Sequence, residues 1–182
     1  MELITDLEAI QQLAEQRHDE FDVLRYQLQY DDDLTDEQID EWVEAIATPI
    51  VVAIDCTLCA NCCRGLLVQL GDDDIASLAI GTGQSAAFIK SNYVDTEIYS
   101  DDPDIVGTFK QQPCALLRGK LCSVYAHRPE ACRMYPQFTP DFRWMLNWMV
   151  EGAGKCPIIY NVLDTISAQV DDWQRNSSIK IP

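Results

Sequence analysis

The residues best suited to chemistry in this chain are cysteines. Half of its eight cysteines fall within eight consecutive positions, in the motif Cys56-x-x-Cys59-x-x-Cys62-Cys63. This density is far higher than packing alone requires. Thiolates bind soft or borderline metals, and a two-residue gap lets the sulfurs of one turn face a single ion or one face of a cluster. The spacing therefore predicts a metal site.

The remaining cysteines lie further along the chain, so distant segments can close over the motif. They are Cys114, Cys122, Cys132 and Cys156. All eight cysteines are candidate metal ligands. They could fill two clusters, one cluster and one zinc site, or one site with unused thiols.

An iron-sulfur cluster is the metal centre that the spacing favours. The triple Cys56-x-x-Cys59-x-x-Cys62 matches the compact part of the bacterial ferredoxin run, in which three thiolates hold three irons of a 4Fe-4S cluster. That run ends in Cys-Pro, and here Cys156-Pro157 supplies a Cys-Pro at long range. Zinc is the alternative, although zinc sites more often show two separate cysteine pairs.

The expected compartment supports metal ligation over a disulfide framework. The first residues, Met1 to Asp6, are acidic where a secretory signal would be basic and then apolar, so we expect a cytoplasmic protein. Disulfide scaffolds belong mainly to small secreted chains, whereas cysteine clusters inside cells more often hold metal or take part in catalysis. No apolar run approaches the roughly 18 to 20 residues of a membrane span, so none is expected.

The net charge of −17 argues against nucleic acid as a partner, because phosphate contacts require Lys and Arg. The charge is concentrated at the start of the chain. Residues 1–48 contain fifteen Asp and Glu against only Arg17 and Arg25. This segment is either a solvated acidic face or a docking surface for a basic protein partner.

Several cationic and polar residues adjoin the cysteines in sequence. A centre held by four thiolates stays negatively charged, so cations and hydrogen-bond donors around it are favoured. Arg64, Arg128 and Arg133 are candidates for this supporting role, and Tyr125 could donate a hydrogen bond to sulfur. The alternative is that they are ordinary surface arginines and a core tyrosine.

Two helices are expected before the cysteines. Apolar residues at alternating spacings of three and four predict one long amphipathic helix from residue 5 to about residue 28. After the break at residues 31–33, Thr35-x-x-Gln38 predicts a capped second helix that ends at Pro49. This helical hairpin, residues 1–48, is expected to be an appendage to a cysteine-cluster domain of residues 49–182.

The cysteine-cluster domain is expected to mix short strands with helices. Apolar β-branched runs predict extended segments at 50–54 and 66–70, and turn signals predict a polar loop over 95–112 and a hairpin over 113–125 that turns at 118–120. Helices are expected at about 72–80, 85–93 and 158–174, and in a short segment that begins at Pro129 and carries Cys132. The stretch 138–150, rich in Trp and Met, is expected to be core. The fold class is therefore mainly α (α+β).

These motifs together carry a family resemblance. The matching positions are Cys56-x-x-Cys59-x-x-Cys62-Cys63, Pro113-Cys114, Cys122-Ser-Val-Tyr125, Arg128-Pro129, Cys132-Arg133, Pro136 and Cys156-Pro157. They resemble the CxxCxxCC cysteine-cluster (YkgJ-like) family over about residues 50–175. That family is described as zinc- or iron-chelating, and the flagellin lysine-N-methylase is similar to it in its cysteine motif.

The resemblance implies metal binding, and two classes of function are compatible with it. The first is a metal-binding protein with a structural, metal-handling or redox role. The second is a metal-dependent enzyme, such as a protein methylase or an oxidoreductase. The sequence favours the first class, because it shows no nucleophile-base pair and no glycine-rich cofactor loop.

Overall fold

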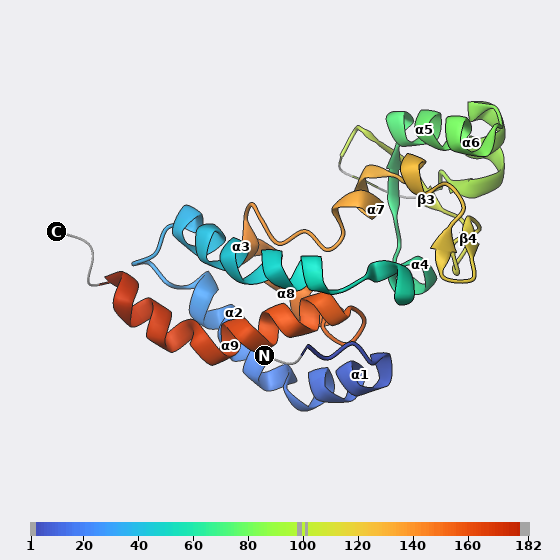
Figure 1. Ribbon diagram of the computed structural model, residues 1–182. Helices are drawn as coiled ribbons and strands as arrows, with labels where there is room; N and C mark the ends of the chain where they lie inside the picture. Colours follow the sequence, from blue (N-terminus) through green and yellow to red (C-terminus); the bar gives the residue numbers. More distant parts are fainter. Residues whose placement is uncertain (1–2, 98–99, 101, 179–182) are drawn as a thin grey trace. The chain divides into compact units, whose positions relative to one another are not determined.

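The computed structural model describes residues 3–97, 100 and 102–178. It divides the chain into two compact units, which are described separately (Figure 1). The helical unit comprises Met1–Asp55 and Pro136–Pro182, and the cysteine unit comprises Cys56–Tyr135. Most of the described residues are helical and the strands are short and antiparallel, which confirms the predicted α+β class.

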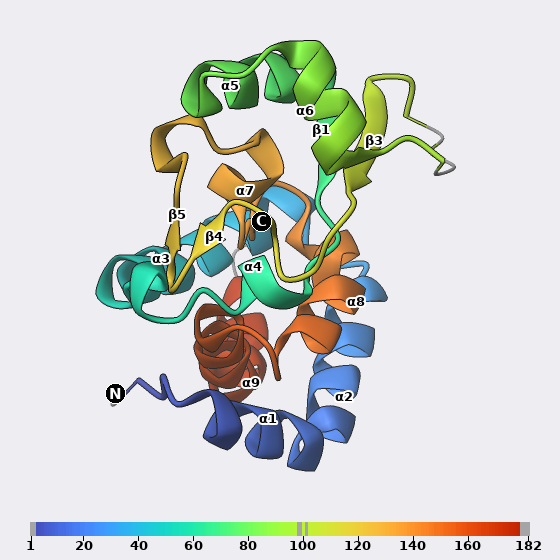
Figure 2. The same cartoon turned by 90° about the vertical axis from the view of Figure 1, so that its right-hand side faces the viewer.

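The helical unit is organised around its last helix. Its helices are α1 (Leu7–Gln16), α2 (His18–Gln29), α3 (Asp36–Ala53), α8 (Phe142–Gly152) and α9 (Pro157–Ser178). Each of the other four contacts α9. Figure 2 shows α9 nearly end-on, with α1 and α2 on adjacent sides of it. The α9 side chains of Ile158, Val162 and Ile166 are almost completely buried, and their burial is the main stabilising contribution that the α9 contacts make.

This packing differs from the predicted division of the chain at residue 48. The first three helices belong to the same unit as α8 and α9, and the boundary after them falls at Asp55. The apolar faces of α1 to α3 therefore pack on the C-terminal helices. Independent folding of residues 49–182 stays a prediction.

The predicted helices of residues 5–48 are present, but two of their limits were wrong. The first helix is interrupted at Arg17, whose φ of −104° and ψ of 11° separate α1 from α2. Thr35 and Gln38 form the predicted capping box at the start of α3. Pro49, however, does not end α3, which continues to Ala53, so the extended segment predicted at 50–54 is also wrong. Ile50 is buried on the same face of α3 as Val43 and Ala47. This burial offsets the loss of the backbone hydrogen bond that proline cannot donate.

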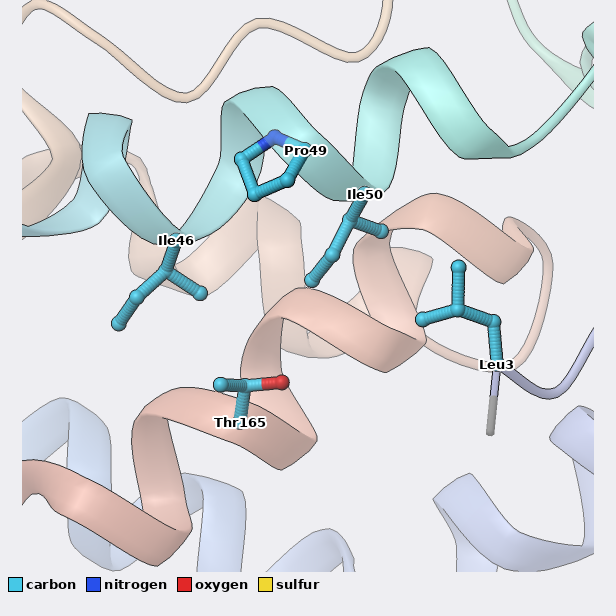
Figure 3. Close-up of a pocket in the computed structure, with 5 residues that line it drawn as sticks. All are labelled: Leu3, Ile46, Pro49, Ile50 and Thr165. Atoms are coloured by element: carbon cyan, nitrogen blue, oxygen red, sulfur yellow. The ribbon is translucent and has the colours of Figure 1, made fainter. Parts of the chain in front are cut away.

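A pocket of about 300 Å³ lies beside Pro49, between α3 and α9 (Figure 3). Its lining is Leu3, Ile46, Pro49, Ile50 and Thr165. Thr165 is the one polar side chain in this lining, and its hydroxyl donates to the backbone oxygen of Asn161 at 2.7 Å. The pocket therefore has an almost wholly apolar wall.

The aromatic stretch of α8 was only partly predicted. Phe142, Leu146 and Met149 are buried as expected. Trp144 and Trp148 point away from that core, with 58% and 76% of their surfaces exposed. Tryptophan content alone did not reveal which face of the helix each ring would occupy.

Within the described residues, no helix is both long and apolar enough to span a membrane.

The cysteine unit contains short elements in close succession. They are η1 (Cys56–Leu58), α4 (Cys62–Gly65), β1 (Gln69–Gly71), α5 (Asp72–Thr82), α6 (Ala86–Tyr93), β2 (Val94–Asp95), β3 (Ile105–Phe109), β4 (Leu117–Arg118), β5 (Leu121–Cys122), η2 (Tyr125–His127) and α7 (Glu130–Met134). Helices α5 and α6 are the predicted pair, ended by Gly83 and capped by Ser85 respectively.

Two small antiparallel sheets complete the cysteine unit. Strand β3 lies between β1 and β2, inside the segment predicted to be a polar loop. Gly107 permits the pairing, because a Cβ at this position would lie 2.4 Å from the backbone oxygen of Asp95. The predicted hairpin is confirmed as β4 and β5, with Leu117 opposite Cys122.

The core of the cysteine unit holds this hairpin in place. Its buried members are Leu70, Ile75, Leu78, Ile89, Val94, Phe109, Leu116 and Val124. Cys114 and Cys122 pack against this cluster and are partly buried. Asp74 at the start of α5 accepts hydrogen bonds from the backbone N–H groups of Gly71 at 3.0 Å and Glu130 at 2.8 Å, which ties α7 to α5.

Truncation of Phe21 tests the packing of the helical unit. Phe21 is 1% exposed, and its ring lies edge-on to that of Tyr160 with centroids 6.2 Å apart. We expect Phe21→Ala to lower the free energy of unfolding by about 3 to 5 kcal/mol, because it leaves a cavity beside α9. Urea denaturation measures the change. Val23→Ala on the same helix is the control, since Val23 is 56% exposed and should cost no more than about 0.5 kcal/mol. Equal losses in the two variants would contradict the described packing.

Candidate metal centre

The cysteine motif folds as a tight turn followed by a short helix. The backbone oxygen of Cys56 accepts hydrogen bonds from the N–H groups of Cys59 at 3.2 Å and Ala60 at 3.0 Å. Ala60 has a φ of 55°, which reverses the chain direction before α4. The N–H of Asn61 then donates to the sulfur of Cys59 at 3.4 Å. A backbone donor directed at sulfur can support a metal-bound thiolate.

Asn61 was not identified from the sequence as a residue that supports the site. Its contribution comes from the backbone, and depends on the left-handed conformation of Ala60. Alanine rarely adopts that conformation, so the residue types gave no signal for it.

A backbone contact brings a fifth cysteine to this motif. The N–H of Cys114 donates to the backbone oxygen of Cys63 at 2.8 Å. The sulfurs of Cys62 and Cys63 lie 4.0 Å apart. Cys122 follows on β5 of the hairpin and Cys132 on α7. The cysteine unit thus contains seven of the eight cysteines, and none of these lies in a disulfide.

The electrostatics single out four of these thiols. The pKa of Cys63 is lowered to about 6, first by the hydrogen bond with Cys62 and then by the charges of Arg128 and Arg64, against the effect of burial. Burial raises the pKa of Cys114, and the nearby Cys63 and Cys122 add to the increase.

Cys132 shows the strongest opposite effect. Its burial raises its pKa to about 12, and the charges of Cys63, Cys114 and Cys122 contribute to that increase. Cys63, Cys114, Cys122 and Cys132 are here called the four-thiol group. They lie close together, because the charges of Cys63 and Cys122 act on both Cys114 and Cys132. Concentrated negative charge of this kind is relieved by a bound cation.

The donor set fits zinc or an iron-sulfur cluster in kind, because both prefer thiolates. The positions of the donors fit such a centre less well than their chemistry does. In the part of the chain that the structure describes, no three His, Cys, Asp or Glu side chains are arranged to hold a single ion. The thiols would have to rotate toward one another, and metal binding would have to remove the proton that burial favours on Cys132.

Two of the predicted arginines lie beside the thiols. Arg64 donates to the backbone oxygens of Cys59 at 2.9 Å and Gly119 at 3.3 Å, which joins the cysteine motif to the turn of the β4–β5 hairpin. The guanidinium of Arg128 lies 3.7 Å from the centre of the Tyr125 ring. Its Nε also donates to the backbone oxygen of Tyr125 at 3.1 Å. Both contacts hold the cation near Cys63.

The other two predicted residues, Arg133 and Tyr125, both contact Arg128. Arg133 donates to the backbone oxygen of Arg128, so it supports that residue rather than a thiol. Tyr125 is half exposed and its ring contacts Arg128. A hydrogen bond from Tyr125 to sulfur stays a prediction.

Cys156 belongs to the helical unit, where it directly precedes α9. It is buried, and its backbone accepts from Tyr160 and donates to Gly152, at 3.0 Å in both cases. Its expected role as a ligand, drawn from the Cys156-Pro157 motif, stays a prediction.

Comparison with known families gives one match. Residues 55–151 match a family model named CxxCxxCC, whose description is "Putative zinc- or iron-chelating domain". The matched range includes the seven cysteines of the cysteine unit and ends before Cys156. Searches of curated proteins and of solved structures find no match.

Replacement of Arg128 tests the electrostatic support of the site. We expect Arg128→Ala to weaken metal retention by about 10 to 100-fold, because it removes a cation that stabilises the Cys63 thiolate. Competition with a chromogenic chelator measures the affinity. Arg118→Ala is the matched control, since Arg118 is also an arginine of the cysteine unit and donates to the backbone oxygens of its near neighbours Ala115 and Leu117. Unchanged retention in Arg128→Ala would reduce Arg128 to a surface residue.

Proposed function

The chain belongs to the CxxCxxCC family of zinc- or iron-chelating domains, and from this we propose that its cysteine unit binds a thiolate metal centre with a structural, metal-handling or redox role. The observation that carries the proposal is the grouping of thiols from separate elements. The cysteine motif, the start of the hairpin, its second strand and α7 each contribute at least one. A fold that only needed to bury sulfur would have no reason to bring thiols from four separate elements together.

Two sets of ligands follow from this grouping. Cys56, Cys59 and Cys62 form the loop triple, with the spacing that suits three irons of a 4Fe-4S cluster. The four-thiol group supplies enough donors for a second cluster or for a tetrahedral zinc. An iron-sulfur cluster, when bound, supplies one-electron transfer, whereas zinc would serve mainly as a structural ion.

The chain's own residues would adjust the properties of either metal. Arg64 and Arg128 offset the negative charge of a tetrathiolate centre, and the Asn61 N–H stabilises the sulfur of Cys59. Cys114 and Cys122 lie against the apolar core of the cysteine unit, which limits the access of water to them. These features lower the cost of holding several ionised thiols in one place.

Metal analysis tests the identity of the centre. We expect anaerobically purified protein to be brown, with iron and acid-labile sulfide in equal amounts, and to bleach on reduction. Elemental analysis and absorption spectra measure this. Colourless protein with stoichiometric zinc and no iron would exclude the iron-sulfur proposal and leave metal chelation in place.

The same analysis on Cys132→Ser separates one centre from two. Loss of only part of the bound metal would support a separate site at the four-thiol group. Loss of all metal would indicate a single shared centre, and unchanged metal content would remove Cys132 from the ligands.

Metal removal tests the contribution of the centre to stability. We expect complete chelation to lower the melting temperature by more than about 5 °C, because binding stabilises only the folded arrangement of thiols. Circular dichroism during heating measures the transition. Chelator already saturated with zinc is the control. An unchanged melting temperature after full metal removal would mean that the centre does not support the fold.

A further inference from the structure

Two exposed tryptophans on α8 form a surface that metal binding does not explain. Trp144 and Trp148 are four residues apart, and side chains at this spacing are neighbours on a helix. Large apolar rings that remain exposed together commonly mark an interaction site, and tryptophan is enriched among the residues that dominate binding energy. This pair is here called the tryptophan face.

Carboxylates lie on both sides of the tryptophan face. The indole N–H of Trp144 donates to Asp36 at 3.2 Å. Asp141 is exposed immediately before α8, and Glu151 is exposed in its last turn, three residues after Trp148. Aromatic rings attract a Lys or Arg cation through their faces, and a nearby carboxylate strengthens that preference.

The chain does not use its own cations at this face. Within the described residues, the cations found over aromatic rings are Arg17, Arg25 and Arg128, and each lies over a Phe or Tyr ring. Arg143 adjoins Trp144 in sequence but is buried. Its guanidinium donates to the backbone oxygens of Asp31 and Leu34 and pairs with Asp36. It is therefore held within the helical unit.

The charge distribution identifies the kind of partner that fits. The segments of the helical unit carry 21 acidic and six basic residues, a net charge of −15, against −2 for the cysteine unit. Charge of this size repels a second copy of the same face and an anionic membrane, and it accelerates association with a basic protein.

We propose that the tryptophan face docks an arginine- or lysine-rich segment of a partner protein. The rings of Trp144 and Trp148 receive the cationic side chains, and Asp141 and Glu151 balance their charge. The residues that form this face belong to the helical unit, whereas the four-thiol group belongs to the cysteine unit.

A basic peptide tests the proposal on the full-length, metal-loaded protein. The probe is an eight-residue peptide of alternating Gly and Arg, and isothermal titration at low and near-physiological salt measures its affinity. We expect Trp148→Ala to raise Kd by about tenfold or more, and Trp144→Ala combined with Trp148→Ala to raise it further. Both positions are exposed, and circular dichroism verifies that the variants remain folded.

The chain offers a matched control for this experiment. Tyr26 and Tyr30 on α2 are also four residues apart, 53% and 74% exposed, and stacked with centroids 5.9 Å apart. Arg25 already lies over Tyr26, at 4.3 Å from its ring centre. The double variant Tyr26→Ala, Tyr30→Ala should therefore bind the peptide with a Kd within about twofold of the wild type. A Gly-Glu peptide of the same length should not bind.

Three results would overturn the proposal. Equal affinity of the tryptophan variants and the wild type would show that the peptide responds to overall charge alone. Self-association that Trp148→Ala abolishes, without peptide binding by the wild type, would assign the face to a second copy of the chain. Sedimentation with lipid vesicles, again without peptide binding, would assign it to a membrane surface.

Discussion

The cost of ionising several neighbouring thiols is the constraint on which a metal centre in the cysteine unit depends. The hydrogen bond with Cys62 and the charges of Arg128 and Arg64 lower the pKa of Cys63, whereas burial and the charges of Cys63, Cys114 and Cys122 raise the pKa of Cys132. These opposite effects arise within one group of side chains. Ionising all four thiols without compensation would carry an electrostatic cost. The arginines and the backbone donors relieve part of it, and a metal that binds several thiolates relieves the rest.

The helical unit is stabilised by a different principle, the burial of apolar surface around α9. Helices from both ends of the chain contribute to that burial, so local helix signals matter less than the shared core. The continuation of α3 through Pro49 illustrates this dominance. The proline removes one backbone hydrogen bond, but Val43, Ala47 and Ile50 remain buried on the same helix face. Apolar packing on both sides of the proline outweighs the local penalty.

The features that could be predicted from the sequence are those with local causes. The capping box at Thr35, the cap at Ser85 and the hairpin turn near Gly119 each depend on residues within one turn. The features that were missed depend on distant contacts. Strand β3 pairs with β2 where Gly107 allows close approach to Asp95, a contact between distant residues. The β-branched run Ile105–Phe109 was a local signal, but the polar residues around it led to the prediction of a loop. The exposed side of α8 is likewise set by which helices cover its other side.

The candidate site shows the same division. The spacing of the cysteine motif predicted the type of ligand, because thiols two residues apart can share a metal. It could not predict which of the later cysteines would come together, since Cys114, Cys122 and Cys132 lie on separate elements. Arg64 and Arg128 were identified by their proximity in sequence, but their hydrogen bonds reach backbone oxygens that only the fold brings near. The assignment of these residues as ligands or supporting residues stays a prediction.

The adjacency of Cys62 and Cys63 makes the start of α4 a junction between the two proposed ligand sets. Successive side chains on an α-helix diverge by about 100°, so neighbouring thiols can serve different centres while sharing one peptide bond. A displacement of the α4 backbone would then alter both centres at once. This arrangement places the two ligand sets next to each other, and it also means that neither centre can change its geometry at α4 without affecting the other. An inserted residue between the two cysteines would leave the loop triple intact in sequence while turning Cys63 away from its neighbours.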